Sequence, residues 1–395
     1  MRHLSLLLLV MLLTLPLGCG NTENSSGTTS KIEVWLDASP ELLPLLREQV
    51  KPLTDARTPV KVNFRVFRFE DLKPAILGCK ANDLDDKPDL IMVSSDWMGE
   101  LVNSGLLQPL PEISTGYVSV ASAAMHWENK CYGVPWSLDV VAMIVNSDLV
   151  KSVPGNFKQL LELGDILPDK IYPLVYDNKN FYYHAAWYHA FGAKLFNDGQ
   201  LEISSDVAAK SLDFAYDLEN RFALVPAKSN QSAAINLFAA GQAAVTINGP
   251  WAIGSFIKNG VNFEVVPIPG PETGEVARPL VGVKGIGITS YCRRKESAQQ
   301  VLDMITSEKF MRKIAAKSLF IPCFKLSGET SGWMQGFVDQ ASRGILMPSR
   351  PEMKFFWSEI NRAMRLRFAQ ASSSKELLLE AEERILKAIA REAAK

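Results

Sequence analysis

The sequence offers few residues whose types and spacing could carry out catalysis. It contains four histidines, and the closest pair, His184 and His189, lies five positions apart. That separation places the two side chains on different faces of a helix, whereas histidines that share a metal on one helix occupy positions i and i+4. We therefore predict no metal site and no cofactor.

Acidic residues gather in one short segment. A calcium-binding EF-hand loop would need glycine at its sixth position and glutamate at its twelfth, and neither is present. The segment is interpreted as a solvated acidic loop, with carboxylates from Asp83, Asp85, Asp86 and Asp89. The sequence also has no G-x-S-x-G motif and no phosphate-binding loop. Because no nucleophile is paired with a base, we predict that the protein is not an enzyme.

The elements that would position any site alternate between strand and helix patterns. Period-two alternation over 60–66 predicts a half-covered strand, and the apolar run 90–93 predicts a buried parallel strand. Further strand patterns cover 32–36, 172–176, 243–247 and 261–266, and helical patterns cover 41–50 and 207–222. Ser373 and Glu376 form a capping box that begins the last helix. This alternation predicts an α/β fold with parallel strands covered on both faces.

The N-terminus predicts export. Arg2 precedes an apolar run over 4–17 that is shorter than the ~20 residues of a spanning helix, so residues 1–18 are interpreted as a signal peptide. Leu-Pro-Leu-Gly before Cys19 resembles the lipobox of bacterial lipoproteins, which implies that Cys19 receives lipid. The alternative is plain secretion with Cys19 unused. Residues 19–30 are polar and predict a flexible linker that lets the domain reach a membrane partner.

Composition narrows the class of protein further. The formal net charge is −1 and the pI is about 6.5, so no global field attracts nucleic acid. The roughly 365 residues after the linker suggest two domains, at about 150 residues per domain. An exported protein can form disulfides, and four cysteines allow three pairings. Pairing and free buried thiols remain equal alternatives for Cys79, Cys131, Cys292 and Cys323.

One segment of the second half has a distinctive order. Residues 237–251 consist of a helix end, a glycine, a buried strand and an Asn-Gly-Pro-Trp turn, in which Pro250 suits the first turn of a helix. This segment resembles the maltose-binding-protein-like relatives among the extracellular solute-binding proteins of ABC sugar importers. Four further blocks resemble that family in the right order, at 88–107, 132–149, 265–288 and 346–357.

The resemblance implies a two-lobed periplasmic-binding-protein fold of type II, each lobe an α/β sheet with helices on both faces. By this interpretation lobe 1 comprises 31–138 and 286–328, and lobe 2 comprises 142–282 and 333–395. The chain would cross the hinge at 139–141, 283–285 and 329–332. A ligand in the cleft would draw the lobes together by hinge motion, and a permease could then distinguish loaded from empty protein. The family implies a monomer.

The resemblance also implies a set of ligand-binding residues. Aromatic rings stack on the apolar faces of a sugar, while carboxylates and amides bind its hydroxyls. Trp251 and Trp357 occupy positions that resemble the stacking aromatics of the family. The other expected contacts are Asp37, Asp96, Trp97, Trp136, Asp139, Asn180 and Tyr182. Val93 and Trp97 depart from the maltodextrin-binding pattern, so a different saccharide is expected. Trp187, inside an aromatic helix, is expected in the core.

The function predicted is therefore capture of a mono- or oligosaccharide and its delivery to the transmembrane subunits of an ABC permease. The protein would lie in the periplasm or at the cell surface, held to a bacterial membrane by its N-terminal lipid. One alternative is a surface glycan-active hydrolase, in which Asp96 and Asp139 would stand ~5–9 Å apart across a glycosidic bond. Another is a glycan receptor without transport. A charged ligand would need cleft cations, and Lys284 is the only evident candidate.

Overall fold

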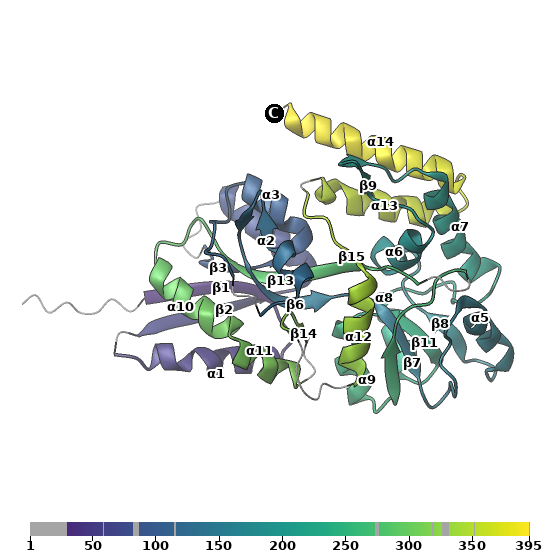
Figure 1. Ribbon diagram of the computed structural model, residues 1–395, viewed down its shortest axis with the longest axis horizontal. Helices are drawn as coiled ribbons and strands as arrows, with labels where there is room; N and C mark the ends of the chain where they lie inside the picture. The colour runs from purple at the N-terminus through teal and green to yellow at the C-terminus, as the bar shows by residue number, and fades with distance from the viewer. Residues whose placement is uncertain are drawn as a thin grey trace, which may run out of the picture.

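The computed structural model describes residues 30–57, 59–81, 87–113, 116–272, 276–317, 320–325, 332–350 and 352–394 (Figure 1). The predicted signal peptide, Cys19 and nearly all of the linker lie outside these residues. So do Asp83, Asp85 and Asp86 of the expected acidic loop, and 329–331 of the third expected hinge crossing.

The first lobe is built on a seven-stranded mixed sheet. Its strands are β1 (Ser30–Asp37), β2 (Val60–Phe67), β3 (Leu90–Ser94), β6 (Val134–Asp139), β13 (Leu280–Ile288), β14 (Ile321–Pro322) and β15 (Ile345–Leu346). They follow the order β14-β6-β13-β3-β1-β2, with β15 paired to the start of β13. β1 is parallel to β2 and β3, whereas β13 is antiparallel to β3 and β6.

The second lobe is built on a four-stranded sheet. Its strands are β7 (Ala142–Asn146), β8 (Tyr172–Val175), β11 (Ala243–Asn248) and β12 (Phe263–Val266), in the order β12-β7-β11-β8. Two short antiparallel pairs complete the described strands: β4 (His126–Trp127) with β5 (Lys130–Cys131), and β9 (Phe196–Asn197) with β10 (Gln200–Leu201). The chain passes from the first sheet to the second between Asp139 and Ala142.

Helices surround both sheets. Those that follow strands of the first sheet are α1 (Leu42–Thr54), α2 (Phe69–Ala81), the 3-10 turn η1 (Ser95–Trp97), α3 (Met98–Asn103), α4 (Ser119–Ala124), α10 (Lys295–Thr306) and α11 (Glu308–Ala315). The others are α5 (Phe157–Ile166), α6 (Phe181–Ala190), α7 (Asp206–Asn220), α8 (Gln231–Ala239), η2 (Pro250–Ala252), α9 (Ile253–Lys258), α12 (Gly332–Arg343), α13 (Met353–Phe368) and α14 (Ser374–Ala393). In Figure 1 the first sheet lies on the left, the second on the right, and α14 lies over α13 along the outside.

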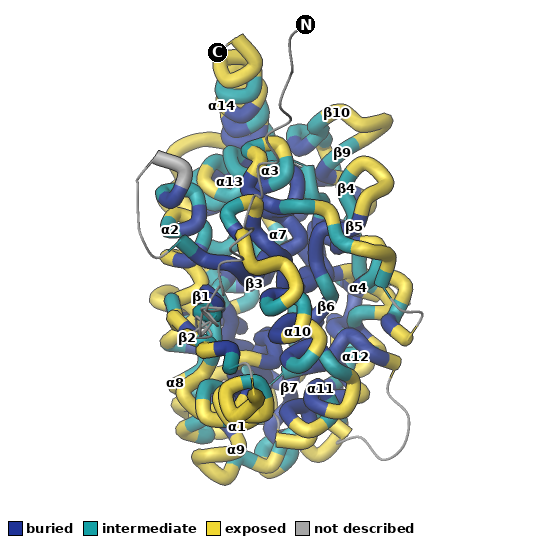
Figure 2. The backbone as a smooth tube through the Cα atoms, turned by 90° about the vertical axis from the view of Figure 1, so that its left-hand side faces the viewer, coloured by how far each residue is buried: buried dark blue, intermediate teal, exposed yellow. Residues whose placement is uncertain are grey.

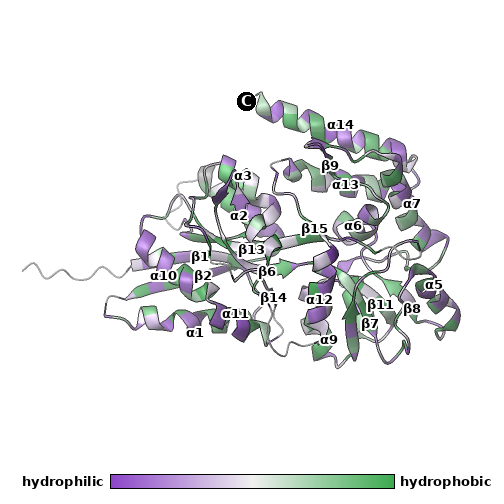
Figure 3. Cartoon of the chain, in the orientation of Figure 1, coloured by the Kyte–Doolittle hydropathy of each residue, from purple (hydrophilic) through white to green (hydrophobic). Residues whose placement is uncertain are grey.

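The core follows from the spacing of apolar residues. On α14 the buried residues Leu377, Leu378, Ala381 and Ile385 recur at helical spacing and pack against α13 and α7. Full burial of a leucine or isoleucine side chain contributes about 1.5–3 kcal/mol, so this one face holds the helix in place. Figure 3 shows the same helix alternating between hydrophobic and hydrophilic residues, and Figure 2 shows the central strands buried beneath partly exposed helices.

Several expectations about local structure are confirmed. The predicted strand at 60–66 lies within β2, that at 90–93 within β3, and the helical pattern at 207–222 corresponds to α7. The Ser373–Glu376 capping box is present in full. Trp187 is completely buried and donates through Nε1 to the carbonyl oxygen of Pro269 at 2.9 Å. The last predicted strand, at 261–266, starts two residues too early, because β12 begins at Phe263.

The structure also answers the question of disulfide pairing that the sequence left open. Cys79, Cys131, Cys292 and Cys323 are all free and buried. Within the described ranges no helix is both long and apolar enough to cross a membrane. Among those same residues no group of three metal-binding side chains comes together.

Candidate functional site

A cavity of about 750 Å³ opens between the two lobes. Of the residues expected to bind a ligand, all but Trp136 line it: Asp37, Asp96, Trp97, Asp139, Asn180, Tyr182, Trp251 and Trp357. They come from β1, η1, β6, α6, η2 and α13, so segments up to 320 positions apart in the chain converge on one space. That these residues contact a ligand remains a prediction, but the fold does bring all eight of them to one cavity.

Strand ends explain why the carboxylates of the first lobe meet. β1 and β3 are parallel neighbours, and the carboxyl ends of parallel strands lie at the same edge of a sheet. Asp37 is the last residue of β1, and Asp96 follows β3 by two residues within η1. Asp139 ends β6, which lies across β13 in the same sheet.

The ammonium group of Lys284 holds two of these carboxylates together. Its Nζ lies 3.1 Å from Oδ2 of Asp37 and 3.2 Å from Oδ2 of Asp139. Burial opposes the charge on this lysine, but the two carboxylates outweigh that effect and raise the pKa of Lys284 above its usual value. The group is therefore a cation throughout the physiological pH range.

Asp96 is the most buried acid of the site, with 8% of its surface exposed. Its Oδ1 accepts a hydrogen bond from Ser94 Oγ at 2.5 Å, and its Oδ2 accepts one from Trp357 Nε1 at 3.1 Å. Burial raises the pKa of Asp96, although both hydrogen bonds and the charge of Lys73 lower it in part. Because Trp357 belongs to the second lobe, this hydrogen bond joins the two walls of the cavity.

Aromatic rings lie on both walls. On the first lobe Phe69 stacks on Trp97, with ring centroids 4.9 Å apart and planes inclined by 29°. On the second lobe the indole of Trp251 lies beside the rings of both Tyr182 and Tyr183, and it is 38% exposed. A side chain at Gly249 would collide with that indole, so glycine at this position lets the ring fold back over the turn. The two walls therefore offer flat apolar surfaces to opposite sides of one ligand.

Asn180 and Tyr182 begin helix α6. Oδ1 of Asn180 accepts from the backbone N–H of Tyr182 at 3.1 Å, so the amide caps the helix and also borders the cavity. The hydroxyl of Tyr182 is buried and has no hydrogen-bond partner among the described residues. An unpaired buried hydroxyl costs free energy, and a ligand that bonded to it would recover that cost.

The structure does not bring Trp136 to the cavity. Its side chain is 1% exposed and packs edge-on against Phe320, with ring centroids 5.9 Å apart. Successive side chains of a strand point to opposite faces, so Trp136 shares the interior face of β6 with Leu138, while Asp139 points the other way into the cleft. The expectation that Trp136 touches ligand is therefore corrected to a core role.

The cavity includes residues that sequence reasoning missed. They are Phe69, Glu70, Lys73, Pro74, Ser94, Tyr183, Gln231, Gly282, Met347, Lys354 and Asn361. Two of them could have been found from helical spacing, because Lys354 and Asn361 stand three residues before and four after Trp357 on α13. Phe69 and Lys73 share a face of α2 for the same reason, but nothing in the sequence marked that helix as a wall of the site.

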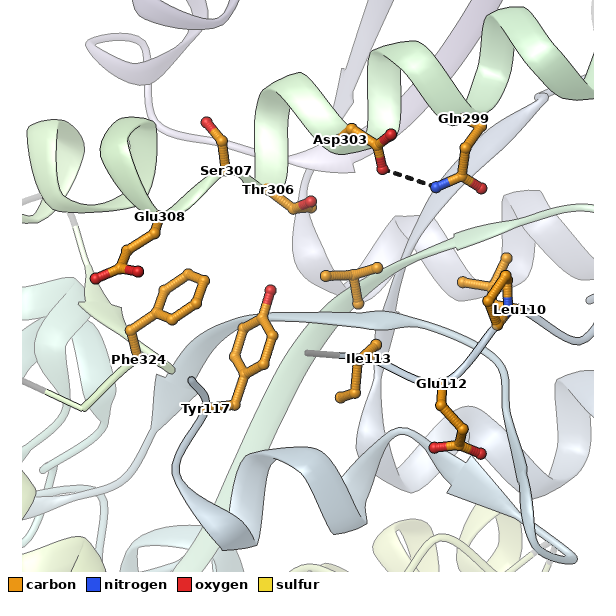
Figure 4. A pocket seen from close by; sticks show the side chains of 12 residues that line it. Leu110, Glu112, Ile113, Tyr117, Gln299, Asp303, Thr306, Ser307, Glu308 and Phe324 are labelled. Carbon is orange, nitrogen blue, oxygen red and sulfur yellow. Dashed lines mark hydrogen bonds between the residues drawn. The ribbon is translucent and has the colours of Figure 1, made fainter. Parts of the chain in front are cut away.

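A second cavity, of about 340 Å³, lies within the first lobe beside α10 and α11 (Figure 4). Acidic side chains border it, but each has a partner nearby. Asp303 accepts from Gln299, Glu308 pairs with Arg312, and Glu112 lies 3.1 Å from a ring nitrogen of His126. This pocket belongs to one lobe and its acids are already engaged, so the cleft between the lobes is the better candidate site.

The chain thus has two lobes and a cavity between them that is bordered by aromatic rings on both walls. A model of the bacterial extracellular solute-binding protein family matches residues 41–311. The chain belongs to this family, as its sequence blocks led us to expect. Membership places it among binding proteins, in agreement with the prediction that it is not an enzyme.

Curated relatives agree with this assignment. The chain is 25% identical over 369 residues to a maltotriose-binding protein of Pyrococcus abyssi, covering 87% of this chain and 78% of the relative. It is 23% identical over 403 residues to a galactooligosaccharide-binding protein of Bacillus subtilis, covering 92% of each. It is also 23% identical over 306 residues to a maltooligosaccharide ABC transporter solute-binding lipoprotein of Streptococcus pneumoniae, covering 70% of each.

A solved structure confirms the type of fold. The maltotriose-binding protein of Thermus thermophilus, bound with maltotriose, superposes with a TM-score of 0.80 at 26% identity. The match covers 91% of this chain and all of the other. The α/β, two-lobed fold expected from the sequence is therefore confirmed, whereas the residue boundaries predicted for the lobes and the hinge remain predictions.

Proposed function

We propose that the protein is the substrate-binding component of an ABC importer and captures a mono- or oligosaccharide by closure of its cleft. The observation that carries the proposal is the pairing of aromatic rings on both walls with carboxylates along the floor of one cavity. Rings such as Trp251 and Phe69 suit the C–H faces of a sugar, and carboxylates such as Asp37 accept from its hydroxyl groups. The ligands named for the relatives are all oligosaccharides, which supports the same class.

The first-lobe wall bears on which saccharide is bound. Trp97 stacks on Phe69 in the first lobe, where the maltodextrin-binding pattern has arginine, and Val93 stands where that pattern has tryptophan. The first-lobe wall is thus rearranged, and we propose a saccharide other than a maltodextrin. The chain is about equally similar to a maltotriose-binding and to a galactooligosaccharide-binding relative, which is compatible with a saccharide other than a maltodextrin.

Thermal unfolding in the presence of sugars tests the proposal directly. The panel comprises maltose, maltotriose, cellobiose, galactobiose, sucrose, trehalose and their constituent monosaccharides. A saccharide present at 100 times its Kd should stabilise the native state by about 2.7 kcal/mol. Trp251→Ala should abolish most of that stabilisation, because the exposed indole would be lost from the second-lobe wall. If no member of the panel stabilises the wild-type protein, the sugar-binding function is wrong.

We also propose that Cys19 is lipidated and that the domain delivers its ligand to the transmembrane subunits of a permease as a monomer. The lipobox-like sequence before Cys19 supports the anchor, and one relative is named as a lipoprotein of an ABC transporter. Mass spectrometry of the protein from bacterial membranes should find a diacylglyceryl modification on Cys19. Cys19→Ala should release the protein from the membrane fraction, and a protein still held there would contradict the anchor.

Small-angle scattering distinguishes an importer component from a receptor that binds glycan without transport. The importer proposal needs a closed, loaded state that a permease can recognise, so saturating saccharide should reduce the radius of gyration. Binding that leaves the radius unchanged would favour the receptor.

A further inference from the structure

Lys284 interrupts an otherwise uncharged strand. The sequence of β13 is Leu-Val-Gly-Val-Lys-Gly-Ile-Gly-Ile, and all of its residues except Lys284 are buried. The side chain of Lys284 keeps 17% of its surface exposed, and it borders the cavity between the lobes. A charge in a buried strand is costly unless it is compensated, so its presence here calls for a specific role.

The partners of Lys284 point to that role. Asp37 and Asp139 flank its ammonium group at 3.1 and 3.2 Å, and their side chains are 29% and 22% exposed. All three border the same cavity. The three groups therefore form a row of hydrogen-bonding sites along the cavity floor, in which one donor lies between two acceptors.

An aromatic ring of the first lobe borders this row. Nζ of Lys284 lies 4.9 Å from the ring centroid of Phe69, so the ammonium also faces an aromatic surface. Gly282, which lies opposite Asp139 in the strand register, has no side chain to cover the cluster. A flat ring can therefore approach the row from the cavity.

The other lysines of the cavity are different. Lys73 pairs with Glu100 at 2.6 Å, and Lys354 pairs with Glu392. Neither of those two glutamates is among the residues that border the cavity. Only Lys284, among the described lysines of the site, has both of its carboxylate partners inside the cavity.

We propose that the Asp37–Lys284–Asp139 row binds two adjacent hydroxyl groups of a neutral sugar ring, and that Lys284 thereby selects the ligand. The inference rests on the proposed sugar-binding function and refines it. Each hydroxyl can donate one hydrogen bond and accept others, whereas an ammonium only donates and a carboxylate only accepts. One hydroxyl would donate to Asp37 and its neighbour to Asp139, and the two would share, as acceptors, the one N–H of Lys284 that the carboxylates leave free.

This arrangement also defines what the row rejects. Two carboxylates outnumber one ammonium, so a sugar carboxylate or phosphate placed there would meet a net negative charge. A sugar lacking one of the two hydroxyls would leave a charged group of the row without its partner. Hydrogen bonds to charged groups are the stronger kind, so the loss of one should weaken binding about 10- to 100-fold.

The test begins with the saccharide that stabilises the wild-type protein most in the thermal panel described above. Isothermal titration with that sugar compares the wild type with Lys284→Met, which keeps all but the last atom of the side chain's length and removes its charge. We expect Kd to rise at least 10-fold. The control is Lys313→Met, which breaks an exposed first-lobe ion pair with Glu48 and should change Kd less than twofold.

Because Lys284→Met leaves two carboxylates without their cation, its fold is checked by circular dichroism and thermal unfolding. A second measurement needs only the wild type, with monodeoxy derivatives of the same saccharide. The largest losses of affinity should fall on two hydroxyls that are adjacent on one ring. In Lys284→Met the same two deletions should each cost less than in the wild type, because the shared donor is already gone and only the hydrogen bonds to the carboxylates remain.

The outcomes separate two kinds of failure. If no sugar of the panel binds the wild type, the proposed function fails and this inference falls with it. If a sugar binds the wild type and a folded Lys284→Met binds it within twofold, the sugar-binding function stands and the role of Lys284 is refuted. Losses spread over non-adjacent hydroxyls of the wild-type ligand would likewise overturn the diol arrangement, whether or not the variant folds.

Discussion

Replacing Trp357 with phenylalanine tests whether one hydrogen bond holds the two lobes together in the absence of ligand. Nε1 of Trp357, on α13, donates to Oδ2 of Asp96, on η1 of the other lobe, at 3.1 Å. The only other side-chain donor to this carboxylate among the described residues is Ser94. In the variant the ring remains aromatic, but a carboxylate that is 8% exposed loses one of its two donors.

The size of the effect follows from the charge on the acceptor. A hydrogen bond to a charged group contributes about 1.5–3 kcal/mol. When the lobes separate, water can solvate Asp96, so the loss falls mainly on the state in which the lobes meet. Since 1.4 kcal/mol corresponds to a factor of ten, the unliganded population of that state should fall about 10- to 140-fold relative to the open state.

Small-angle scattering of the unliganded protein measures this change. The radius of gyration should increase in Trp357→Phe and stay at the wild-type value in the matched variant Trp251→Phe, whose ring lies in the same cavity but contacts its own lobe. A double-mutant cycle that combines Trp357→Phe with Asp96→Asn should give a coupling free energy between Trp357 and Asp96 of about 0.5–3 kcal/mol. Equal radii for the wild type and both variants, together with no coupling, would refute the idea that this bond joins the lobes.

Three further predictions concern stability and the core. Burial raises the pKa of Asp96, so its ionisation lowers the free energy of unfolding, and this loss is regained as pH falls through the folded pKa. In urea unfolding, the free energy of unfolding of Asp96→Asn should match or exceed that of the wild type at pH 7 and lose that advantage towards pH 4. Burial lowers the pKa of His184 to about 4, so protonation of this histidine in the unfolded chain should lower the free energy of unfolding by about 3 kcal/mol as pH falls from 6.5 to 4. His184→Gln should reduce this pH dependence. If the ring were accessible, the pH dependence would be the same in the variant and the wild type. Trp136→Phe should lower the free energy of unfolding by about 1–3 kcal/mol and leave sugar affinity within twofold, and a tenfold loss of affinity would return Trp136 to the site.

The family resemblance supplied most of the residues that line the cavity, and local patterns agree with two of them. Asp37 ends a strand, and Trp251 follows a turn that begins a helix. Trp136 was misplaced because side chains three positions apart on a strand point to opposite faces, so Trp136 cannot share the cleft face of β6 with Asp139. The stacking of Phe69 on Trp97 joins α2 to η1 and depends on packing between helices, which no local pattern reports.

Long-range geometry limited the other inferences too. Whether four cysteines pair depends on distances between segments that are far apart in the chain, so the number of cysteines alone could not decide it. Lys284 was visible in the sequence as a lone charge in an apolar run. Its two partners were also named, but only the sheet order β6-β13-β3-β1 shows that they meet around it.

The pairing of β6 with β13 has a consequence for the energetics of capture. These strands lie at the passages between the two lobes, and Asp139 of one is opposite Gly282 of the other in a ladder whose register shifts between Lys284 and Gly285. The two passages are thus joined by backbone hydrogen bonds into a paired ribbon. Because its residues are already ordered before ligand arrives, bending it sacrifices little of the backbone entropy, about 1–2 kcal/mol per residue, that ordering free loops would require. Closure then adds little of its own to the entropic cost of binding.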